Sequence, residues 1–160
     1  MGETRGRMSA VAGVEGLFEA HLGVRDLERS IDFYRDVIGL ELASRAPEIG
    51  AVFLWVGGPG EAMLGLWAHG AAPMSLSMHL AFKVPLERVL ATPRRLRALG
   101  LTPLSFDGVE TDEPSVIGWM PAAAIYFRDP DGHLLEHLAM LEGPPDPERR
   151  ILTWAEWTRR

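Results

Sequence analysis

HLGVRDLER, residues 21–29, returns as HLAFKVPLER, residues 79–88, with one residue inserted. Both copies open with His-Leu, continue with an apolar pair and a basic residue, and close with Leu-Glu-Arg. The copies lie 58 residues apart, from His21 to His79, which is long enough for one unit of a strand, a helix and three strands. The sequence therefore predicts two tandem βαβββ modules.

The first module begins with LFEAHLGV, residues 17–24, in which large apolar and other residues alternate as in a half-buried strand. Residues 26–39 follow with apolar positions at helical spacing, an N-cap at Asp26 and a terminating Gly39. This pattern predicts an amphipathic helix. Three short strands separated by glycine and proline signals complete the module: LELASRA, AVFLWVGG and EAMLGLWA.

The second module repeats this order, starting with an alternating strand at 74–84. A helical segment then runs to Gly100, and Pro93 predicts an interruption at which Thr92 caps a restarted helix. The remaining expectations are a possible strand at 101–106, a long loop at 107–121, and two strands joined by a tight turn in AIYFRDPDGHLLEHLAM, residues 124–140.

These elements predict an α+β fold in which both modules form one cupped eight-stranded mixed sheet, with a C-terminal helix added. The domain spans 16–142, with modules at about 16–70 and 74–141. Residues 1–15 are expected to be a disordered tail, and 143–160 a proline-rich linker and helix. Asp146 and Pro147 are the expected start of that helix, and Ile151, Trp154 and Trp157 its docking stripe toward this domain or a twin subunit, so we expect a homodimer.

Composition narrows the class of partner. The chain has 160 residues, a net charge of −6 and a pI near 5.3, which disfavours nucleic acid and anionic membranes. It has no cysteine, so disulfides, thiolate ligands and thiol nucleophiles are excluded. The uncharged stretch 62–82 is interrupted by glycine, proline, serine and histidine, which argues against a membrane span. We expect a cytoplasmic protein with a small-molecule substrate.

Three potential metal ligands lie in predicted strands, each on the face with fewer large aliphatic side chains: His21, His79 and Glu136. Two imidazoles and one carboxylate suit zinc, manganese, nickel or iron and leave positions open for substrate or water. A single strand histidine is more often a structural residue, but the repeat brings equivalent strand positions together.

Three neighbours of Glu136 have other expected roles. Tyr126 is either a donor to a bound substrate oxygen or an ordinary cross-strand aromatic. His137 points to the opposite face and is expected to pack against a helix or a subunit. His133 lies in the DPDGH turn and is expected to be solvated, while Asp129 accepts backbone N–H bonds in that turn.

The stretches HLGVRDLERSIDFYRDVIGLEL, SMHLAFKV and YFRDPDGHLLEHL together resemble the vicinal oxygen chelate superfamily, which includes glyoxalase I, extradiol dioxygenases and fosfomycin-resistance thiol transferases. The resemblance covers about residues 16–141 and implies paired modules around one divalent metal. It implies His21, His79 and Glu136 as ligands, with Glu136 and Tyr126 as the catalytic residues and no further cofactor.

Departures from the individual families limit the choice of reaction. Gly65 stands where glyoxalase I carries a fourth ligand, and Trp119 where extradiol dioxygenases carry a histidine. Gly23 replaces a threonine of the fosfomycin transferases, whereas bleomycin-binding relatives lack the metal ligands. The leading hypothesis is a divalent-metal enzyme (lyase, isomerase or thiol transferase) whose substrate chelates the metal through adjacent oxygens. The alternatives are a metal-independent protein that sequesters a small molecule or antibiotic, and an extradiol-type dioxygenase.

Overall fold

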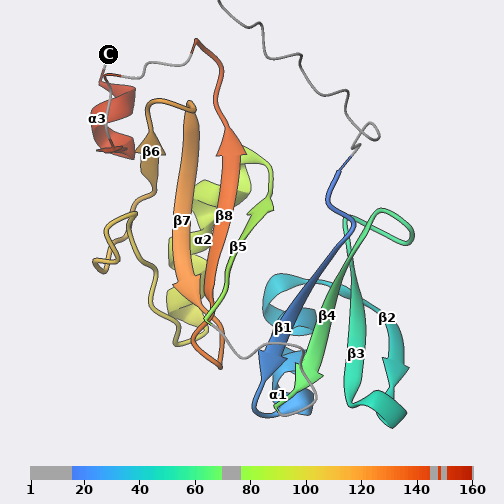
Figure 1. Ribbon diagram of the computed structural model, residues 1–160. Coiled ribbons are helices and arrows are strands. Elements are labelled where there is room, and N and C mark those ends of the chain that lie inside the picture. The colour runs from blue at the N-terminus through green and yellow to red at the C-terminus, as the bar shows by residue number, and fades with distance from the viewer. Residues whose placement is uncertain (1–15, 70–76, 145–147, 149–150, 160) are drawn as a thin grey trace, which may run out of the picture.

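The strands lie in two sheets, each built by one of the predicted modules (Figure 1). The computed structural model describes residues 16–69, 77–144, 148 and 151–159. Sheet A has the order β1-β4-β3-β2 and sheet B the order β5-β8-β7-β6-β9. Their bounds are β1 Glu19–Val24, β2 Glu41–Ala46, β3 Ala51–Val56, β4 Ala62–Ala68, β5 His79–Lys83, β6 Ser115–Ile117, β7 Ala122–Arg128, β8 Leu134–Met140 and β9 Ile151–Thr153.

The two sheets repeat the same connectivity. In each module the first strand pairs in parallel with the last, β1 with β4 and β5 with β8, and the intervening strands run antiparallel. A parallel pair needs a crossover, which the module's helix provides. The α+β class, the two βαβββ modules and the C-terminal helix are therefore confirmed. The eight repeat strands are divided between two hydrogen-bonded sheets, with β1 and β5 each at an edge.

The first helix begins and ends where the sequence predicts. Asp26 precedes α1 (Leu27–Asp32) and accepts a bond from the backbone N–H of Arg29 at 3.1 Å. Gly39 ends the helical segment with φ at +87°, a conformation that glycine adopts without strain. The unexpected part is η1 (Phe33–Ile38), which is wound as a π-helix. This wider turn accompanies the burial of both Phe33 and Tyr34 in the core.

The second helix, α2 (Leu86–Ala98), runs without a break through Pro93, so the predicted restart is wrong. Thr92 caps no new helix, because its hydroxyl donates to the carbonyl of Arg88 one turn earlier at 2.8 Å. Pro93 is buried. Burial of this helix against β7 and β8 compensates for the backbone bond that proline cannot make.

The segment between α2 and β7 also differs from the prediction. Leu104 makes only isolated bridges, to Glu110 and Tyr126, so the strand expected at 101–106 is wrong. The sixth strand, β6, lies instead inside the expected loop 107–121, where it pairs with β7. Its three residues are all buried, and so short an apolar run carries no periodicity by which a strand could be recognised.

The C-terminal segment adds a ninth strand, which the sequence did not predict. β9 pairs antiparallel with β6 and covers that edge of sheet B, and α3 (Trp154–Thr158) follows it directly. Ile151 is therefore a strand residue, and its assignment to a helical stripe is wrong. The expected helix start at Asp146 and Pro147 and the expected tail at 1–15 lie outside the described residues.

Thr153 joins β9 to α3 through a reciprocal capping box. Its hydroxyl accepts from the backbone N–H of Glu156, and the Glu156 carboxylate accepts from the backbone N–H of Thr153. We expect Thr153→Ala to lower the local free energy of opening by about 1 kcal/mol. Amide hydrogen exchange of α3 and β9 measures this, and unchanged exchange rates there would contradict it. Thr102→Ala, at an exposed threonine outside this segment, is the control.

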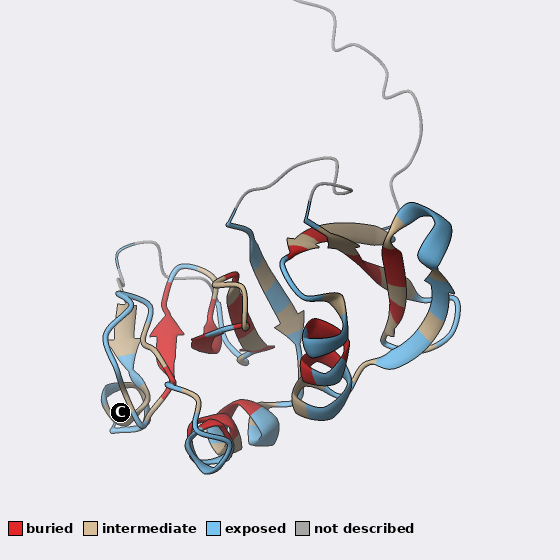
Figure 2. Ribbon diagram, turned by 90° about the horizontal axis from the view of Figure 1, so that it is seen from below, coloured by how far each residue is buried: buried red, intermediate tan, exposed pale blue. Residues whose placement is uncertain are grey.

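One hydrophobic core spans both modules. It contains Leu22, Leu64 and Tyr34 from the first module and Phe127 and Leu135 from the second. Figure 2 shows the helices of the two modules with their buried faces turned inward and the outermost strand of sheet A largely exposed. A shared core of this kind fixes the two modules relative to each other, because separating them would expose large apolar side chains to water.

The turn between β7 and β8 clasps the first module. Asp129 accepts the buried hydroxyl of Tyr34 at 3.0 Å, and it also accepts the backbone N–H groups of Asp131 and His133, as predicted for this turn. Burial raises the pKa of Tyr34, and the charge of Asp129 adds to this, so the phenol remains a donor. We call Asp129, Asp131 and His133 the turn clasp.

Asp131 also connects the turn clasp to the first module. The Asp131 side chain is 4% exposed and accepts bonds from Arg25, Arg29 and Ser30. Burial raises the pKa of Asp131, but the bonds from Arg25 and Ser30 outweigh it, so that pKa lies below the usual value. Because this pKa is lowered, Asp131 contributes its full stabilisation at any pH above the ordinary pKa of a carboxyl group. That stabilisation is lost as the pH falls through the lowered pKa.

His133 is buried at 3% exposure, so the prediction of a solvated side chain is wrong. Its Nδ1 accepts the backbone N–H of Met78 at 3.1 Å, and its Nε2 lies 3.0 Å from the carbonyl oxygen of Gly23. Since Nδ1 accepts, the proton of the neutral ring lies on Nε2 and is donated to Gly23. His133 thereby links the residue before β5 to β1.

No helix among the described residues is long and apolar enough to cross a membrane.

Candidate metal centre in two half-sites

Sheet B brings His79 and Glu136 together, as predicted. His79 lies at the start of the edge strand β5, and β5 pairs in parallel with β8, which carries Glu136. The Nε2 atom of His79 is 3.0 Å from Oε2 of Glu136. The imidazole side chain is 47% exposed and the carboxylate 6% exposed, so the pair lies at the surface with the carboxylate beneath the ring. We call His79, Tyr126 and Glu136 the Glu136 half-site.

The second oxygen of Glu136 is suited to bind a cation. Among the described residues, Oε1 of Glu136 is the buried side-chain polar atom without a hydrogen-bond partner. A buried carboxylate oxygen without a donor costs free energy unless a cation or a donor compensates for it. An oxygen and an imidazole nitrogen on one surface are the donors that zinc, manganese, nickel and iron accept. The half-site therefore fits a divalent metal.

Tyr126 lies directly across from Glu136 in the β7–β8 register. Its ring is 6.1 Å from the ring of His79 and 6.1 Å from that of Phe106, between centroids. Burial raises the pKa of the Tyr126 phenol, and the charge of Glu136 and a hydrogen bond to its carboxylate raise it further. At neutral pH the hydroxyl thus keeps its proton and can donate a hydrogen bond, but it cannot act as a base.

His21 belongs to a separate cluster on sheet A. It pairs with Gly65 in the β1–β4 register, and its ring stacks on Trp67 with centroids 5.4 Å apart. Phe53 packs edge-on against the same ring. A side chain at position 65 would place its Cβ only 3.3 Å from Nδ1 of His21, so the glycine leaves room for the imidazole. We call His21, Glu19 and Trp67 the His21 half-site.

The hydrogen bonds of His21 define its tautomer. The indole N–H of Trp67 donates to Nδ1 at 2.5 Å, and Nε2 lies 3.3 Å from a carboxylate oxygen of Glu19. The neutral ring therefore carries its proton on Nε2, toward Glu19. A metal bound at Nε2 would need that proton moved to Nδ1, which Trp67 occupies as a donor. His21 can therefore bind a metal through either nitrogen only when the bond from Trp67 is given up.

The three predicted ligands do not converge within one chain. No group of three or more histidine, aspartate or glutamate side chains in the described ranges is arranged to hold a metal ion. The structure brings Glu136 to His79 and places His21, with a side chain 34% exposed, in a different cluster. Each half-site is thus open to solvent and incomplete as a three-ligand centre.

The expectation for His137 is confirmed. Its ring lies on the opposite face from Glu136 and packs against α2, where Nδ1 is 3.0 Å from the hydroxyl of Thr92. Burial, with a smaller effect from the charge of Arg88, lowers the pKa of His137 to about 4. The ring is therefore neutral at physiological pH and lies on the helix side of sheet B.

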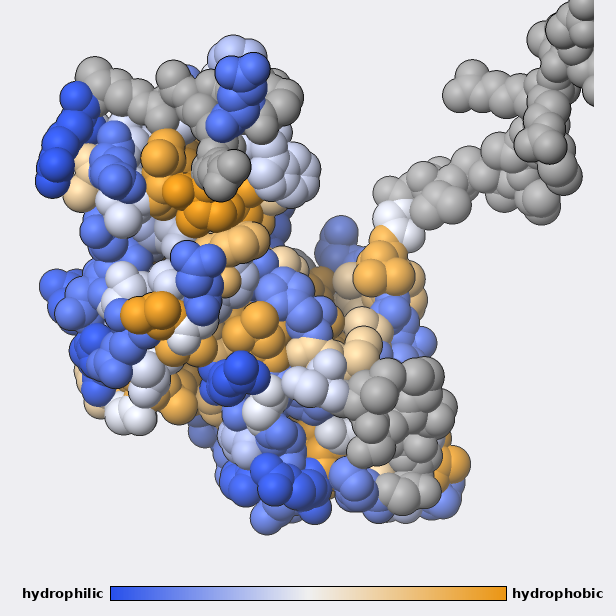
Figure 3. All heavy atoms as spheres, turned by 60° about the vertical axis from the view of Figure 1, so that its left-hand side comes forward, coloured by the Kyte–Doolittle hydropathy of each residue, from blue (hydrophilic) through white to orange (hydrophobic). Residues whose placement is uncertain are grey.

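The second module exposes several large apolar side chains, one of which contacts the Glu136 half-site. Phe106 is in contact with Tyr126, and Val109 and Trp119 lie in the segment that leads from α2 to β7. Figure 3 shows apolar residues gathered into a patch on this module, among hydrophilic neighbours. A pocket completed by these residues would favour an apolar portion of a ligand.

The sequence alone did not assign Glu19 or Trp67 as partners of His21. Glu19 lies two positions before His21 and so on the same strand face, a signal that strand alternation does contain. Trp67 reaches His21 only through the β1–β4 register, which carries no local sequence signal. Phe106 was likewise not predicted, because its contact with Tyr126 depends on the bridge of Leu104 to β7.

The chain has two βαβββ modules, and each carries part of a set of histidine and carboxylate side chains. This arrangement defines a protein of the glyoxalase-like class. The sequence profile of the glyoxalase/bleomycin resistance protein/dioxygenase superfamily matches residues 16–137. The chain belongs to this superfamily.

Solved structures agree with this assignment. A glyoxalase/bleomycin resistance protein/dioxygenase from Nocardioides is 28% identical, with 86% of this chain and 91% of that chain covered and a TM-score of 0.59. Lactoylglutathione lyase from Agrobacterium tumefaciens is 23% identical, with 80% and 96% covered and a TM-score of 0.61. The fosfomycin resistance protein FosX from Listeria monocytogenes, solved with Mn(II) and sulfate, is 24% identical, with 81% and 93% covered and a TM-score of 0.58.

Proposed function

We propose that this protein is a divalent-metal enzyme in which His21, His79 and Glu136 bind one metal ion and a small substrate binds the metal through adjacent oxygens. The observation that carries the proposal is the buried, unpartnered Oε1 of Glu136 beside the exposed ring of His79. When bound, the metal supplies Lewis-acid polarisation of the substrate oxygens.

The chain's own residues have separable roles in this proposal. Glu136 has two oxygens, of which one faces His79 and the other is free, so the carboxylate can contribute a ligand atom and hold a proton. Tyr126 keeps its phenolic proton and donates a hydrogen bond to a substrate oxygen, which stabilises negative charge there. The exposed apolar side chains exclude water from the remainder of the substrate.

We further propose that the complete centre forms between two copies of the chain, in a homodimer. His21 and the His79–Glu136 pair lie in different clusters of one chain, and both half-sites are open to solvent. A two-fold axis would place the His21 half-site of one copy on the Glu136 half-site of the other and produce two equivalent centres. A centre shared between two copies would also explain why one chain carries two incomplete sets of metal ligands.

Metal titration of the purified, chelator-treated protein tests the proposal. Mn(II) is the first ion to try because the FosX neighbour was solved with it, and zinc, nickel and ferrous iron follow. The expected result is one ion per chain for the wild type and none at the same concentration for His79→Ala. If no ion binds near stoichiometry, the metal-independent sequestering protein becomes the better hypothesis. Iron binding with oxygen uptake on catechols would favour the dioxygenase.

The tautomer of His21 predicts the direction in which a substitution of Trp67 changes the metal affinity. Trp67→Phe keeps an aromatic ring beside His21 but removes the N–H that occupies Nδ1. We expect the metal to bind several-fold more tightly, since a competing bond of about 1 kcal/mol is gone. Calorimetric titration measures the affinity, with Trp55→Phe on β3 as the control. Weaker binding by the Trp67 variant would contradict this account of His21.

A further inference from the structure

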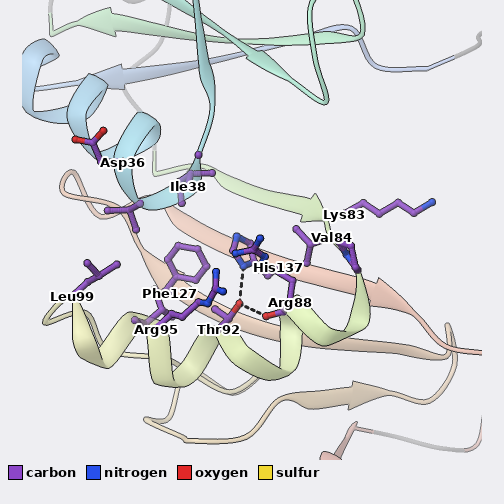
Figure 4. Close-up of a pocket in the computed structure, with 14 residues that line it drawn as sticks. Asp36, Ile38, Lys83, Val84, Arg88, Thr92, Arg95, Leu99, Phe127 and His137 are labelled. Carbon is purple, nitrogen blue, oxygen red and sulfur yellow. Dashed lines mark hydrogen bonds between the residues drawn. The ribbon is translucent and has the colours of Figure 1, made fainter.

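A cavity of about 470 Å³ lies between the two modules on the helix side of sheet B. Its walls are η1 with Gly39 from the first module, and α2, β5, β7 and β8 from the second (Figure 4). We call it the helix-side pocket. His137 lines it, and because neighbouring residues of a strand point to opposite faces, the pocket lies behind the sheet from Glu136. It is thus separate from the Glu136 half-site.

The charges around this pocket are unbalanced. Arg88 and Arg95 line it, and neither forms an ion pair in the part of the chain that the structure describes, whereas the side chain of Lys83 points away from the cavity (Figure 4). The one lining carboxylate, Asp36, has both oxygens bound by Arg35. Two unneutralised cations beside one cavity attract an anion, in a chain whose net charge is −6.

The two arginines are placed to act together. Arg88, Thr92, Arg95 and Leu99 follow each other on α2 at spacings of four, three and four residues, so they form one stripe along the pocket wall. On the same helix Arg97, which does not line the pocket, bonds to Asp112 and Glu110. Unlike Arg97, the two arginines that face the cavity have no carboxylate partner among the described residues.

The rest of the wall is apolar. Phe127 and Leu96 are buried, and Val84 and Ile38 approach the cavity from opposite modules. The neutral ring of His137 and the hydroxyl of Thr92 already bond to each other. An occupant would therefore need a charged head for the arginines and an apolar body for the phenylalanine and leucine, at a size that 470 Å³ admits.

We propose that the helix-side pocket binds a small amphipathic anion. Its carboxylate or phosphate lies between Arg88 and Arg95, and its apolar body packs on Phe127 and Leu96 of the second module and Ile38 of the first. The ligand contacts both modules at once, so its binding stabilises their present arrangement. Because β5 and β8 carry His79 and Glu136 on their other face, occupancy of this pocket also stiffens the strands that present those residues.

Calorimetric titration and thermal unfolding with three probes test the proposal. Benzoate and phenyl phosphate carry an aromatic body with a carboxylate or a phosphate head, and benzamide carries the same body without charge. We expect at least one anion to bind saturably and to raise the Tm, and benzamide to do neither. The anion that binds more tightly identifies the head group. Arg88→Gln and Arg95→Gln should each weaken binding about tenfold, the value of one charge-assisted bond.

Control variants distinguish anion binding in the helix-side pocket from metal binding at the proposed centre. Arg94→Gln removes an exposed cation of the same helix that does not line the pocket, and it should leave the affinity unchanged. Binding should also persist in Glu136→Gln, whether or not that variant holds metal. Three results would overturn the proposal: neither anion binds at millimolar concentration, benzamide binds as well as the anions, or the arginine variants bind like Arg94→Gln while circular dichroism shows them folded.

Discussion

Glu136→Gln is expected to reduce metal affinity by at least about 100-fold, more than the loss produced by removing residues that only orient a ligand. An amide keeps the shape of the side chain but lacks the negative charge that a divalent ion requires. Calorimetric titration with Mn(II) measures the loss. The matched control is Glu41→Gln, an exposed strand glutamate of β2, which should bind metal like the wild type.

The same substitution should not destabilise the metal-free protein. In the wild type the Glu136 carboxylate is buried with one oxygen unpartnered, and a neutral amide relieves that cost. We therefore expect the metal-free variant to be as stable as the wild type or more stable in urea unfolding. A large loss of stability together with unchanged metal binding would mean that Glu136 is a structural residue.

Asp129→Ala is expected to produce the largest loss of stability, about 3 kcal/mol or more. The buried carboxylate accepts three donors: the Tyr34 hydroxyl and the backbone N–H groups of Asp131 and His133. Removing it leaves buried donors unsatisfied, each at a cost of about 1–3 kcal/mol. Urea unfolding at neutral pH measures the change.

Asp36→Ala is the control for this prediction. Asp36 is an exposed aspartate whose bonds go to the neighbouring Arg35, and such surface pairs contribute little. Its loss should change stability by no more than about 0.5 kcal/mol. If the two aspartate variants unfold at the same urea concentration, the turn clasp does not hold the modules together.

The sequence predicted the parts of the fold that depend on local pattern. The repeat defined the two modules, and Asp26 and Gly39 predicted both ends of the first helical segment, because capping acts within a few residues. The strand β6 was missed because three buried residues show no periodicity. Burial of His133 was missed because its carbonyl partner, Gly23, is 110 residues away.

The candidate site was likewise predictable where it depends on strand pattern, and not where it depends on contacts between distant parts of the chain. The pairing of His79 with Glu136 could be predicted, since both lie on the same face of strands that begin and end one module. The position of His21 relative to that pair could not, because it depends on how two sheets pack and not on any strand pattern. The bond from Trp67 to His21 likewise arises from strand register, and it changes what His21 needs in order to bind a metal.

A mixture of two chains that each lack a different metal ligand tests whether the centre is shared between two copies. His21→Ala and Glu136→Gln chains are co-refolded in equal amounts, and bound Mn(II) is counted after removal of excess ion. If the centre forms between two copies, half of the dimers contain one intact centre, and the mixture holds about a quarter of the wild-type metal. Each variant alone holds none. A mixture that also holds none, although the two chains form mixed dimers, would contradict a centre shared between copies.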